Sequence, residues 1–395
     1  MITINDKTLC CGCGACAQAC PTGCITMKED EEGFLYPSID REKCVNCGKC
    51  EEVCPILQVD RKKENKEGLF EEPFAVGGWH RDQNVRNASS SGGAFSLFAN
   101  EILKQGGVVF GAAMNGCVVE HTAAVDEEGL AKQRGSKYVQ SRIGTAYQQV
   151  KKYLEEGRKV LFSGTPCQTA GLVSFLGKKH ENLWLVDFIC HGVPSPKVFA
   201  QYLESLEKKK GSKITSFSFR EKDKGWKPSG LQLGTKITFA DGTVLRKYPA
   251  FRDTYMNGFL EDLILRPSCY ECRFKAVPKW GADFTIADFW GVNQAKPELN
   301  DGRGTSLVLI NTDQGRKLFK AVKENFHGKK CDWKTATKKN PTLVRPARRP
   351  ALRDRIFGEL EERGYEKVAR KRMSTGKTVM HKSFRILKGK VKKSD

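Results

Sequence analysis

One cysteine pattern occurs twice near the start of this chain, and it constrains the fold more than any other feature. Two sets of four cysteines share the spacing C-x2-C-x2-C-x3-C and are each followed by proline: Cys10, Cys13, Cys16 and Cys20, and then Cys44, Cys47, Cys50 and Cys54. Three thiolates on a tight loop can bind one face of an iron-sulfur cube. The fourth is carried away by the next helical turn and reaches a second cube.

This spacing is the run that binds two 4Fe-4S clusters in bacterial ferredoxins. We therefore expect each cluster to take three cysteines from one run and the last cysteine of the other run: Cys10, Cys13, Cys16 and Cys54 for one, and Cys44, Cys47, Cys50 and Cys20 for the other. Zinc knuckles and disulfides are the alternatives. Zinc sites usually show two CxxC halves separated by a longer loop, so the spacing favours iron-sulfur clusters.

The rest of the cysteine usage and the N-terminus predict a cytoplasmic protein. The chain has 395 residues and 16 cysteines, and its first residues lack the basic and apolar regions of a secretory leader. No apolar run approaches the length of a membrane span. In a reducing cytoplasm thiols remain available as ligands, and disulfides are not expected.

Charge is spread unevenly along the chain. The net charge is +21, yet residues 1–58 carry five Lys/Arg and nine Asp/Glu, whereas residues 367–395 carry eleven Lys/Arg and one Asp. The tail has no nucleic-acid-binding signature, so nucleic acid is not the expected partner. An acidic partner fits the tail, and so does peripheral contact with an anionic membrane surface, aided by Phe384, Ile386 and Leu387.

Composition shifts divide the chain into four predicted parts. These are a ferredoxin-type domain at 1–58, a charged linker at 59–73, a larger second domain at 74–330, and a helical basic extension at 331–395. The second domain alternates apolar strands with helices, which predicts an α/β fold with a parallel sheet. Residues 108–114 and 118–125 read as a hairpin turning at Asn115-Gly116. Residues 213–249 read as an antiparallel insertion.

Two loops of this domain have the character of binding loops. A Ser/Gly loop that leads into a helix exposes free backbone N–H groups, which suits a dinucleotide pyrophosphate; an ordinary N-cap is the alternative. This loop comprises Ser90, Ser91, Gly92 and Gly93. The second loop mixes small, cationic and aromatic residues, and includes Gly135, Ser136, Lys137, Tyr138 and Gln140.

Four further cysteines form a dispersed set. Cys167 and Cys190 each follow an expected strand, where α/β sheets gather their ligands, and Cys269 and Cys272 form a CxxC pair. The set suits a third iron-sulfur cluster or a zinc ion. Buried structural thiols are one alternative. A nucleophile with its base, Cys190 with His191, is another.

Six motifs in a fixed order give the chain a family resemblance. They are Ser-Ser-Gly-Gly-Ala-Phe (90–95), Arg-Gly-Ser-Lys-Tyr-Val (134–139), Gly-Thr-Pro-Cys-Gln (164–168), Ile-Cys-His-Gly-Val-Pro-Ser (189–195), Cys-Tyr-Glu-Cys (269–272) and Asp-Phe-Thr-Ile-Ala-Asp-Phe-Trp-Gly (283–291). With them the chain resembles the coenzyme F420 hydrogenase/dehydrogenase beta-subunit family over residues 1 to about 325. The resemblance implies FAD, bound by the two loops together with Gly164 and Thr165. It also implies a third 4Fe-4S cluster on Cys167, Cys190, Cys269 and Cys272.

The implied function is an oxidoreductase that passes electrons between its clusters and a hydride donor or acceptor such as coenzyme F420. A flavin exchanges hydride with a small molecule and single electrons with a cluster, and the N-terminal clusters lead to an external electron-transfer protein or a further member of a redox complex. Lys137 and Tyr138 are expected to orient the flavin, and His191 to donate a proton. Two alternatives stay open. One is a ferredoxin-dependent reductase of cell-surface polysaccharide biosynthesis without F420, and the other is a non-catalytic electron-transfer subunit.

Overall fold

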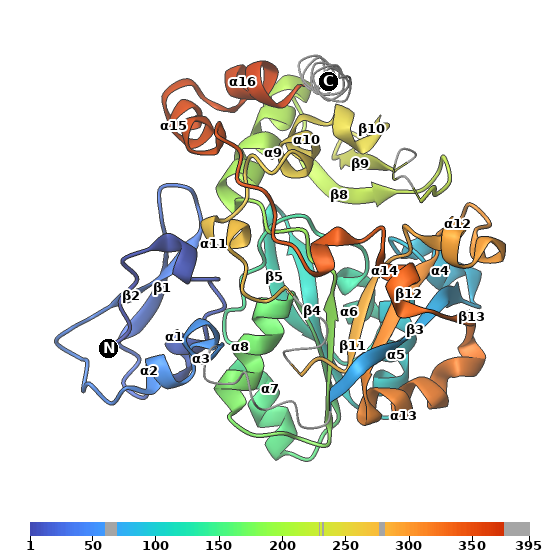
Figure 1. Cartoon of the computed structure of the whole chain (residues 1–395). Coiled ribbons are helices and arrows are strands. Elements are labelled where there is room, and N and C mark those ends of the chain that lie inside the picture. Colours follow the sequence, from blue (N-terminus) through green and yellow to red (C-terminus); the bar gives the residue numbers. More distant parts are fainter. Residues whose placement is uncertain (60–68, 229, 231–232, 276–280, 375–395) are drawn as a thin grey trace, which may run out of the picture.

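The computed structural model describes residues 1–59, 69–228, 230, 233–275 and 281–374. Most of the predicted linker, and most of the basic tail with Phe384, Ile386 and Leu387, lie outside the described residues. Figure 1 shows a small N-terminal region beside a large sheet with helices on both faces, and a smaller sheet with its own helices above them. The expected mixed α/β architecture is confirmed.

The N-terminal region is built from short elements around the cysteines. They are η1 (Lys7–Leu9), α1 (Ala15–Ala19), β1 (Ile25–Glu29), β2 (Leu35–Ile39), α2 (Lys49–Glu52) and α3 (Pro55–Gln58). β1 and β2 pair antiparallel. α1 and α2 each follow a glycine, Gly14 and Gly48, at the same place in the two cysteine runs. The sequence repeat is therefore also a structural repeat. Its core is small, with cysteines packed among a few aliphatic side chains.

The large sheet has eight strands. Their order is β13 (Phe326–Cys331), β3 (Leu69–His80), β12 (Ser306–Thr312), β11 (Phe284–Asp288), β7 (Leu183–Phe188), β6 (Val160–Ser163), β4 (Val108–Asn115) and β5 (Val118–Ala124). The four strands β4, β6, β7 and β11 are mutually parallel. The hairpin of β4 and β5 is confirmed. Antiparallel strands flank the parallel core on both sides.

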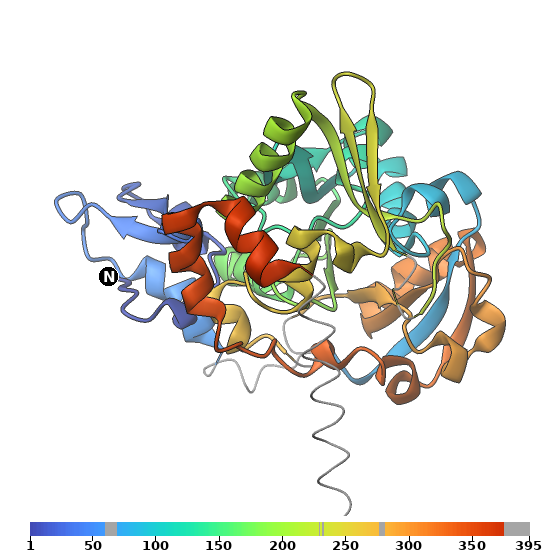
Figure 2. The same ribbon diagram turned by 90° about the horizontal axis from the view of Figure 1, so that it is seen from above.

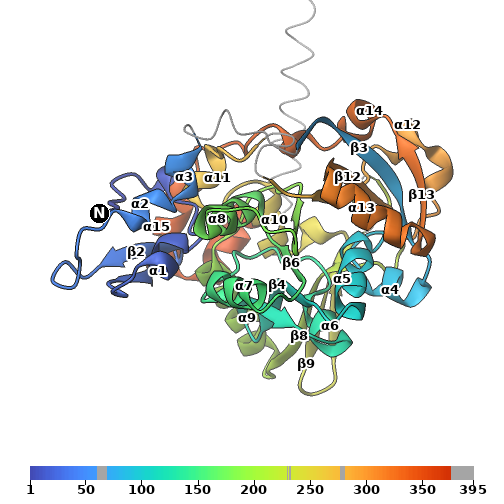
Figure 3. The ribbon, with the colours of Figure 1, turned by 90° about the horizontal axis from the view of Figure 1, so that it is seen from below.

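Helices cover both faces of this sheet because its central strands are apolar on both faces. Val109 and Leu161 pack toward one face with helices α5 (Ala94–Lys104), α6 (Glu127–Gln133) and α13 (Asp313–Val322). Val108 and Phe110 pack toward the other face with α7 (Ala146–Glu155) and α8 (Pro166–Leu176). Cys11 and Cys13 share this second core. Figure 3 shows α8 beside the N-terminal region, where it contacts α1 and α3.

Two strands at one edge of the sheet differ from the sequence expectation. β3 begins at Leu69, inside the segment assigned to the linker, because Leu69 pairs with Thr312 of β12. Charged residues and a proline have low strand propensity, so the sequence does not indicate a strand here. Backbone pairing with β12 outweighs this low propensity. β13 was not expected, and it pairs with β3 along its whole length.

The antiparallel insertion forms a separate three-stranded sheet. Its strands are β8 (Ile214–Glu221), β9 (Gly234–Phe239) and β10 (Val244–Lys247). Two helices, α9 (Pro196–Lys210) and α10 (Thr254–Leu260), share an aromatic core with it that includes Phe199, Tyr202 and Tyr255. In the part of the chain described, no helix is both long enough and apolar enough to cross a membrane.

The C-terminal segment crosses the molecule and returns to the N-terminal region. Its elements are α14 (Trp333–Thr337), η5 (Pro341–Leu343), α15 (Arg353–Arg363), α16 (Tyr365–Val368) and η6 (Ala369–Met373). Of its last helices, α16 and η6 contact α9 and α10, whereas α15 lies beside the N-terminal region (Figure 2). There, buried Arg353 forms a bidentate ion pair with Glu32. The remaining helices are α4 (Gln83–Ala88), α11 (Pro267–Tyr270) and α12 (Val292–Ala295).

Candidate iron-sulfur and flavin site

The N-terminal cysteines line two separate cavities, each of about 340 Å³. The first cavity, here called cavity one, has four cysteines of the predicted set on its wall: Cys10, Cys13, Cys16 and Cys54. Cavity two has the other predicted set: Cys20, Cys44, Cys47 and Cys50. The last cysteine of each run thus lies with the first three of the other run. Cys24, outside both runs, also lines cavity two, with its Sγ 3.3 Å from that of Cys20.

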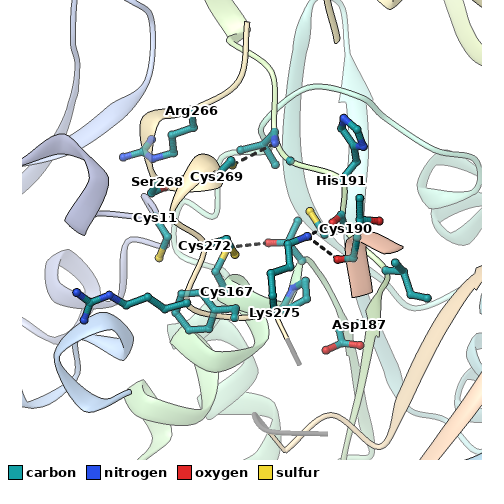
Figure 4. A pocket seen from close by; sticks show the side chains of 18 of the residues that line it. Cys11, Cys167, Asp187, Cys190, His191, Arg266, Ser268, Cys269, Cys272 and Lys275 are labelled. Atoms are coloured by element: carbon teal, nitrogen blue, oxygen red, sulfur yellow. Dashed lines mark hydrogen bonds between the residues drawn. The ribbon is translucent and has the colours of Figure 1, made fainter. Parts of the chain in front are cut away.

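A third cavity, of about 740 Å³, lies where the large sheet meets α8 and α11. Its wall contains the dispersed cysteine set, Cys167, Cys190, Cys269 and Cys272, together with Cys11 from the N-terminal region. Figure 4 shows these side chains around one space. Cys167 is the second residue of α8, which follows β6 after two residues, and Cys190 lies two residues after β7, so the parallel strands place both at the same edge of the sheet.

Cavity three also has polar and charged groups on its wall. His191 Nε2 lies 2.6 Å from Asp262 Oδ1, which holds the ring in one orientation. Lys275 Nζ donates to the carbonyls of Cys190 and Thr342, and so ties η5 to the cavity. Asp187 is 6% exposed, and burial raises the pKa of its carboxyl to about 7.

Two cysteine sulfurs of cavity three have hydrogen-bonding partners, one a backbone N–H and the other a side-chain hydroxyl. Val193 N–H donates to Cys269 Sγ at 3.4 Å, and Thr165 Oγ1 lies 3.1 Å from Cys167 Sγ. Hydrogen bonds to the sulfurs are one of the factors that set cluster potential. Within the described ranges, no three His, Cys, Asp or Glu side chains are grouped as ligands of one metal ion. A cubane is larger than an ion and separates its cysteine sulfurs farther.

The two predicted flavin loops lie side by side. Ser136 N–H donates to Ser90 Oγ at 2.7 Å, and the two hydroxyl oxygens are 3.0 Å apart. Ser91 Oγ donates to the Thr305 carbonyl at 2.8 Å. Gly92 N–H donates to Ser306 Oγ, so this amide is already used within the protein. Gly93 begins α5 in the left-handed conformation.

Lys137 and Tyr138 have different surroundings. The Lys137 ammonium donates to three carbonyls at the end of α6, those of residues 132, 133 and 134. Burial lowers its pKa to about 7, while the three acceptors favour the charged form. Tyr138 stacks on Phe259 at 4.8 Å, and its hydroxyl accepts from Arg220. Lys137 therefore caps a helix, and Tyr138 belongs to a polar cluster.

The remaining predicted cofactor residues lie toward the cysteines. Gln140 Nε2 donates to the Cys11 carbonyl at 3.0 Å, so its side chain contacts the N-terminal region. Gly164 N–H donates to the Val186 carbonyl, which continues the pairing of β6 with β7. Thr165 is the N-cap of α8 and lines cavity three. The structure thus divides the predicted set between the flavin loops and the third cavity.

Two arginines matter here that the sequence motifs did not single out. Arg220 of β8 donates hydrogen bonds to both carboxylate oxygens of Asp288. It also donates to the Tyr138 hydroxyl and the Ser90 carbonyl, and so connects the two predicted flavin loops. Arg266 lines cavity three and bonds the Cys10 carbonyl. Neither stands in a motif with a fixed spacing. Only the position of Arg266 shortly before the CxxC pair offered a signal.

The comparisons with known proteins cover both regions of the chain. Residues 157–332 match the family model for the C-terminal part of the beta subunit of coenzyme F420 hydrogenase/dehydrogenase, and residues 9–56 match the 4Fe-4S dicluster domain. A chain of the F420-reducing NiFe hydrogenase complex from Methanosarcina barkeri aligns at 18% identity and a TM-score of 0.46, covering 70% of this chain and 91% of that one. No curated protein matches the chain. The family resemblance drawn from the motifs is confirmed.

Proposed function

We propose that this chain is a three-cluster flavoprotein oxidoreductase. The proposal starts from two matches: residues 157–332 match the C-terminal part of the beta subunit of coenzyme F420 hydrogenase/dehydrogenase, and residues 9–56 match the 4Fe-4S dicluster domain. The chain would pass electrons between an external carrier and a hydride donor or acceptor such as coenzyme F420. The observation that carries the proposal is cavity three, where four cysteines from separate segments share one wall.

The contact between cavities one and three supports a relay. Cys11 lies between Cys10 and Cys13 in the sequence, and it lines both cavity one and cavity three. On the other side, Gly171 of α8 packs so closely that a Cβ there would lie 2.9 Å from Cys13 Cβ. The two cavities are adjacent, because Cys11 and Ile56 line both of them. Cavity two lies at the outer end, and Cys47 on its wall is exposed, which suits contact with an external carrier.

The cluster around Arg220 supports flavin binding between the two loops. Arg220 Nε is buried and has no hydrogen-bond partner among the described residues, which suits an additional acceptor at this place. Lys222, two residues along the chain at the end of β8, donates to the carbonyls of Arg86 and Ser91. Burial lowers its pKa to about 8. These cations, with Ser90 and Ser136, would hold an anionic dinucleotide.

In this scheme FAD, when bound, exchanges hydride with the small molecule and single electrons with the third cluster. The residues of the chain hold and orient it. Tyr138 is fixed by its stacking and by Arg220, and Lys137 fixes the end of α6 beside the loop. His191, held by Asp262, is the group placed to move a proton at the edge of cavity three.

Anaerobic purification with iron, flavin and zinc analysis tests the proposal. Three clusters predict about twelve iron atoms per chain, and one FAD. Cys190→Ala should lower the iron to about eight atoms while the N-terminal clusters keep their spectra. Cys117→Ala is the matched control, because Cys117 is exposed and lies on none of the three cavity walls. About eight iron atoms in the wild type, with zinc present, would refute the third cluster.

The small-molecule partner needs a separate assay. The purified chain should reduce a viologen dye with reduced coenzyme F420 as donor. Full iron and FAD content without this turnover would reject F420 as the partner. It would then favour the polysaccharide-pathway reductase or the non-catalytic subunit.

A further inference from the structure

Arg266 is a fully buried guanidinium that joins the N-terminal region to the catalytic domain. It is 0% exposed and immediately precedes α11. Nε donates to the Cys10 carbonyl at 2.8 Å, Nη1 to Gln140 Oε1 at 3.1 Å, and Nη2 to the Leu35 carbonyl at 3.0 Å. The guanidinium also stacks on the Tyr36 ring at 4.2 Å. Every one of its hydrogen-bond acceptors is neutral.

The other fully buried arginines are neutralised by carboxylates. Arg86 bonds Asp301 with both terminal nitrogens, and Arg353 does the same with Glu32. Among the described residues, no carboxylate forms an ion pair with Arg266. A buried charge without a counter-charge costs several kcal/mol, which makes an isolated guanidinium at this place unfavourable.

The groups that surround Arg266 indicate what supplies the missing negative charge. The hydrogen bond to the Cys10 carbonyl places the guanidinium beside the first cysteine run, and Cys11 and Cys269 lie with it on the wall of cavity three. Cys10 belongs to cavity one, and Cys269 and Arg266 itself line cavity three. A 4Fe-4S cluster held by four thiolates carries net negative charge, and reduction adds one more negative charge. Arg266 therefore lies between two anionic sites.

We propose that Arg266 is the shared counter-ion of the first and third clusters and raises the reduction potential of both. The inference rests on the proposed three-cluster function. A fixed positive charge in a low-dielectric interior stabilises the reduced, more negative form of a neighbouring cluster. In the proposed relay an electron would pass from one cluster to the other, and Arg266 itself would be neither protonated nor oxidised. Arg266 would ligate neither cluster and would act only through its fixed positive charge.

The cysteine loop is shaped to admit this guanidinium. Gly12 has φ +68°, and a Cβ there would lie 2.8 Å from Arg266 Nη1 and 3.0 Å from Gln140 Nε2. Gln140 accepts from Arg266 and donates to the Cys11 carbonyl. The glycine between two cysteines thus allows the charge to approach the loop that holds the first cluster.

Redox titrations of the full chain, followed by electron paramagnetic resonance, test the proposal. In Arg266→Gln, the reduced-to-oxidised ratio of the first and third clusters at the wild-type midpoint should fall about tenfold, which is about 59 mV for a one-electron couple. The second cluster should keep its midpoint and serves as the internal reference. Arg266→Lys retains the charge and should keep both ratios within about threefold of wild type.

The matched control is the double variant Arg353→Met with Glu32→Gln, which removes a buried pair of no net charge at the same interface. It should leave all three midpoints unchanged.

Gly12→Ala is the second variant, used if Arg266→Gln does not retain its clusters. It should lower the reduced-to-oxidised ratio of the first cluster alone. Unchanged midpoints in the charge-removing variant, or an equal fall in Arg266→Lys, would overturn the proposal. If the wild type lacks the third cluster, the relay fails, while the shift of the first cluster still tests Arg266.

Discussion

The two N-terminal cavities and the third cavity are lined by cysteines in different surroundings. Cavities one and two measure about 340 Å³ each, and no carboxyl group of the described residues lines either of them. Cavity three measures about 740 Å³ and has Asp187, His191 and Lys275 on its wall. The N-terminal sites come from short loops, whereas the third requires β6, β7 and α11 to meet.

This difference separates two ways of building a redox site. Local spacing brings three thiolates together, the last cysteine of the other run adds the fourth, and the result is a site suited to carrying electrons. Tertiary packing adds titratable and charged groups, which allow a site to handle protons and to adjust its potential. We expect the first kind to depend on its clusters for folding, because its core is small, and the second to keep its fold without them.

The largest expected difference between the two regions is in hydrogen-exchange protection after iron is removed. Chelation should abolish hydrogen-exchange protection in residues 1–58, because their small core consists mainly of cysteines and a few aliphatic residues. The eight-stranded sheet should keep its protection, since its core contains no predicted cluster ligand on the side of α5 and α13. Loss of protection in both regions together would show that the sheet also depends on iron. Hydrogen exchange before and after chelation, followed by reconstitution, measures this.

A smaller effect, on the free energy of unfolding, is expected at the interface between the N-terminal region and the rest of the chain. Arg353→Met leaves Glu32 buried without its partner, which should lower the free energy of unfolding by about 3 kcal/mol. Denaturant titration of the iron-loaded chain measures this value. Arg349→Met is the control, because its ion pair with Asp354 is largely exposed and should contribute less than about 1 kcal/mol. Equal losses in the two variants would mean that Arg353 does not hold the regions together.

The last prediction concerns a buried carboxyl group on the wall of cavity three. Asp187 has a buried Oδ1 without a hydrogen-bond partner among the described residues, and its pKa is raised to about 7, mainly by burial. The folded chain then holds a proton that the unfolded chain releases near pH 4. The contribution of Asp187 to the free energy of unfolding should therefore fall as pH rises from about 4 to about 7, by at most about 1.4 kcal/mol per pH unit.

Asp187→Asn should remove this part of the pH dependence. Urea midpoints compared at about pH 5 and about pH 8 measure it, since most of the pKa interval lies between these values. Asp354→Asn, at an exposed position, should follow the wild-type profile. Parallel profiles for wild type and Asp187→Asn would contradict a neutral buried carboxyl.

Several parts of the fold could be predicted because their signals are local. The hairpin turning at Asn115-Gly116 and the alternation of strands with helices follow from short-range patterns. β3 and β13 could not be placed in the same way. Their partners lie far away in the chain, and their charged residues resemble a linker and a tail. Pairing across a sheet decides such segments more strongly than propensity does.

By itself, the sequence determined the two N-terminal cysteine sets, because a C-x2-C-x2-C spacing places its thiolates on one loop whatever lies around it. It also indicated which four distant cysteines to consider together. Only the tertiary structure decided that Cys167, Cys190, Cys269 and Cys272 share a cavity, and that Cys11 and Arg266 lie between it and the first site. Side chains far apart in a sequence meet only through packing, and the charge around a buried site is a property of that packing.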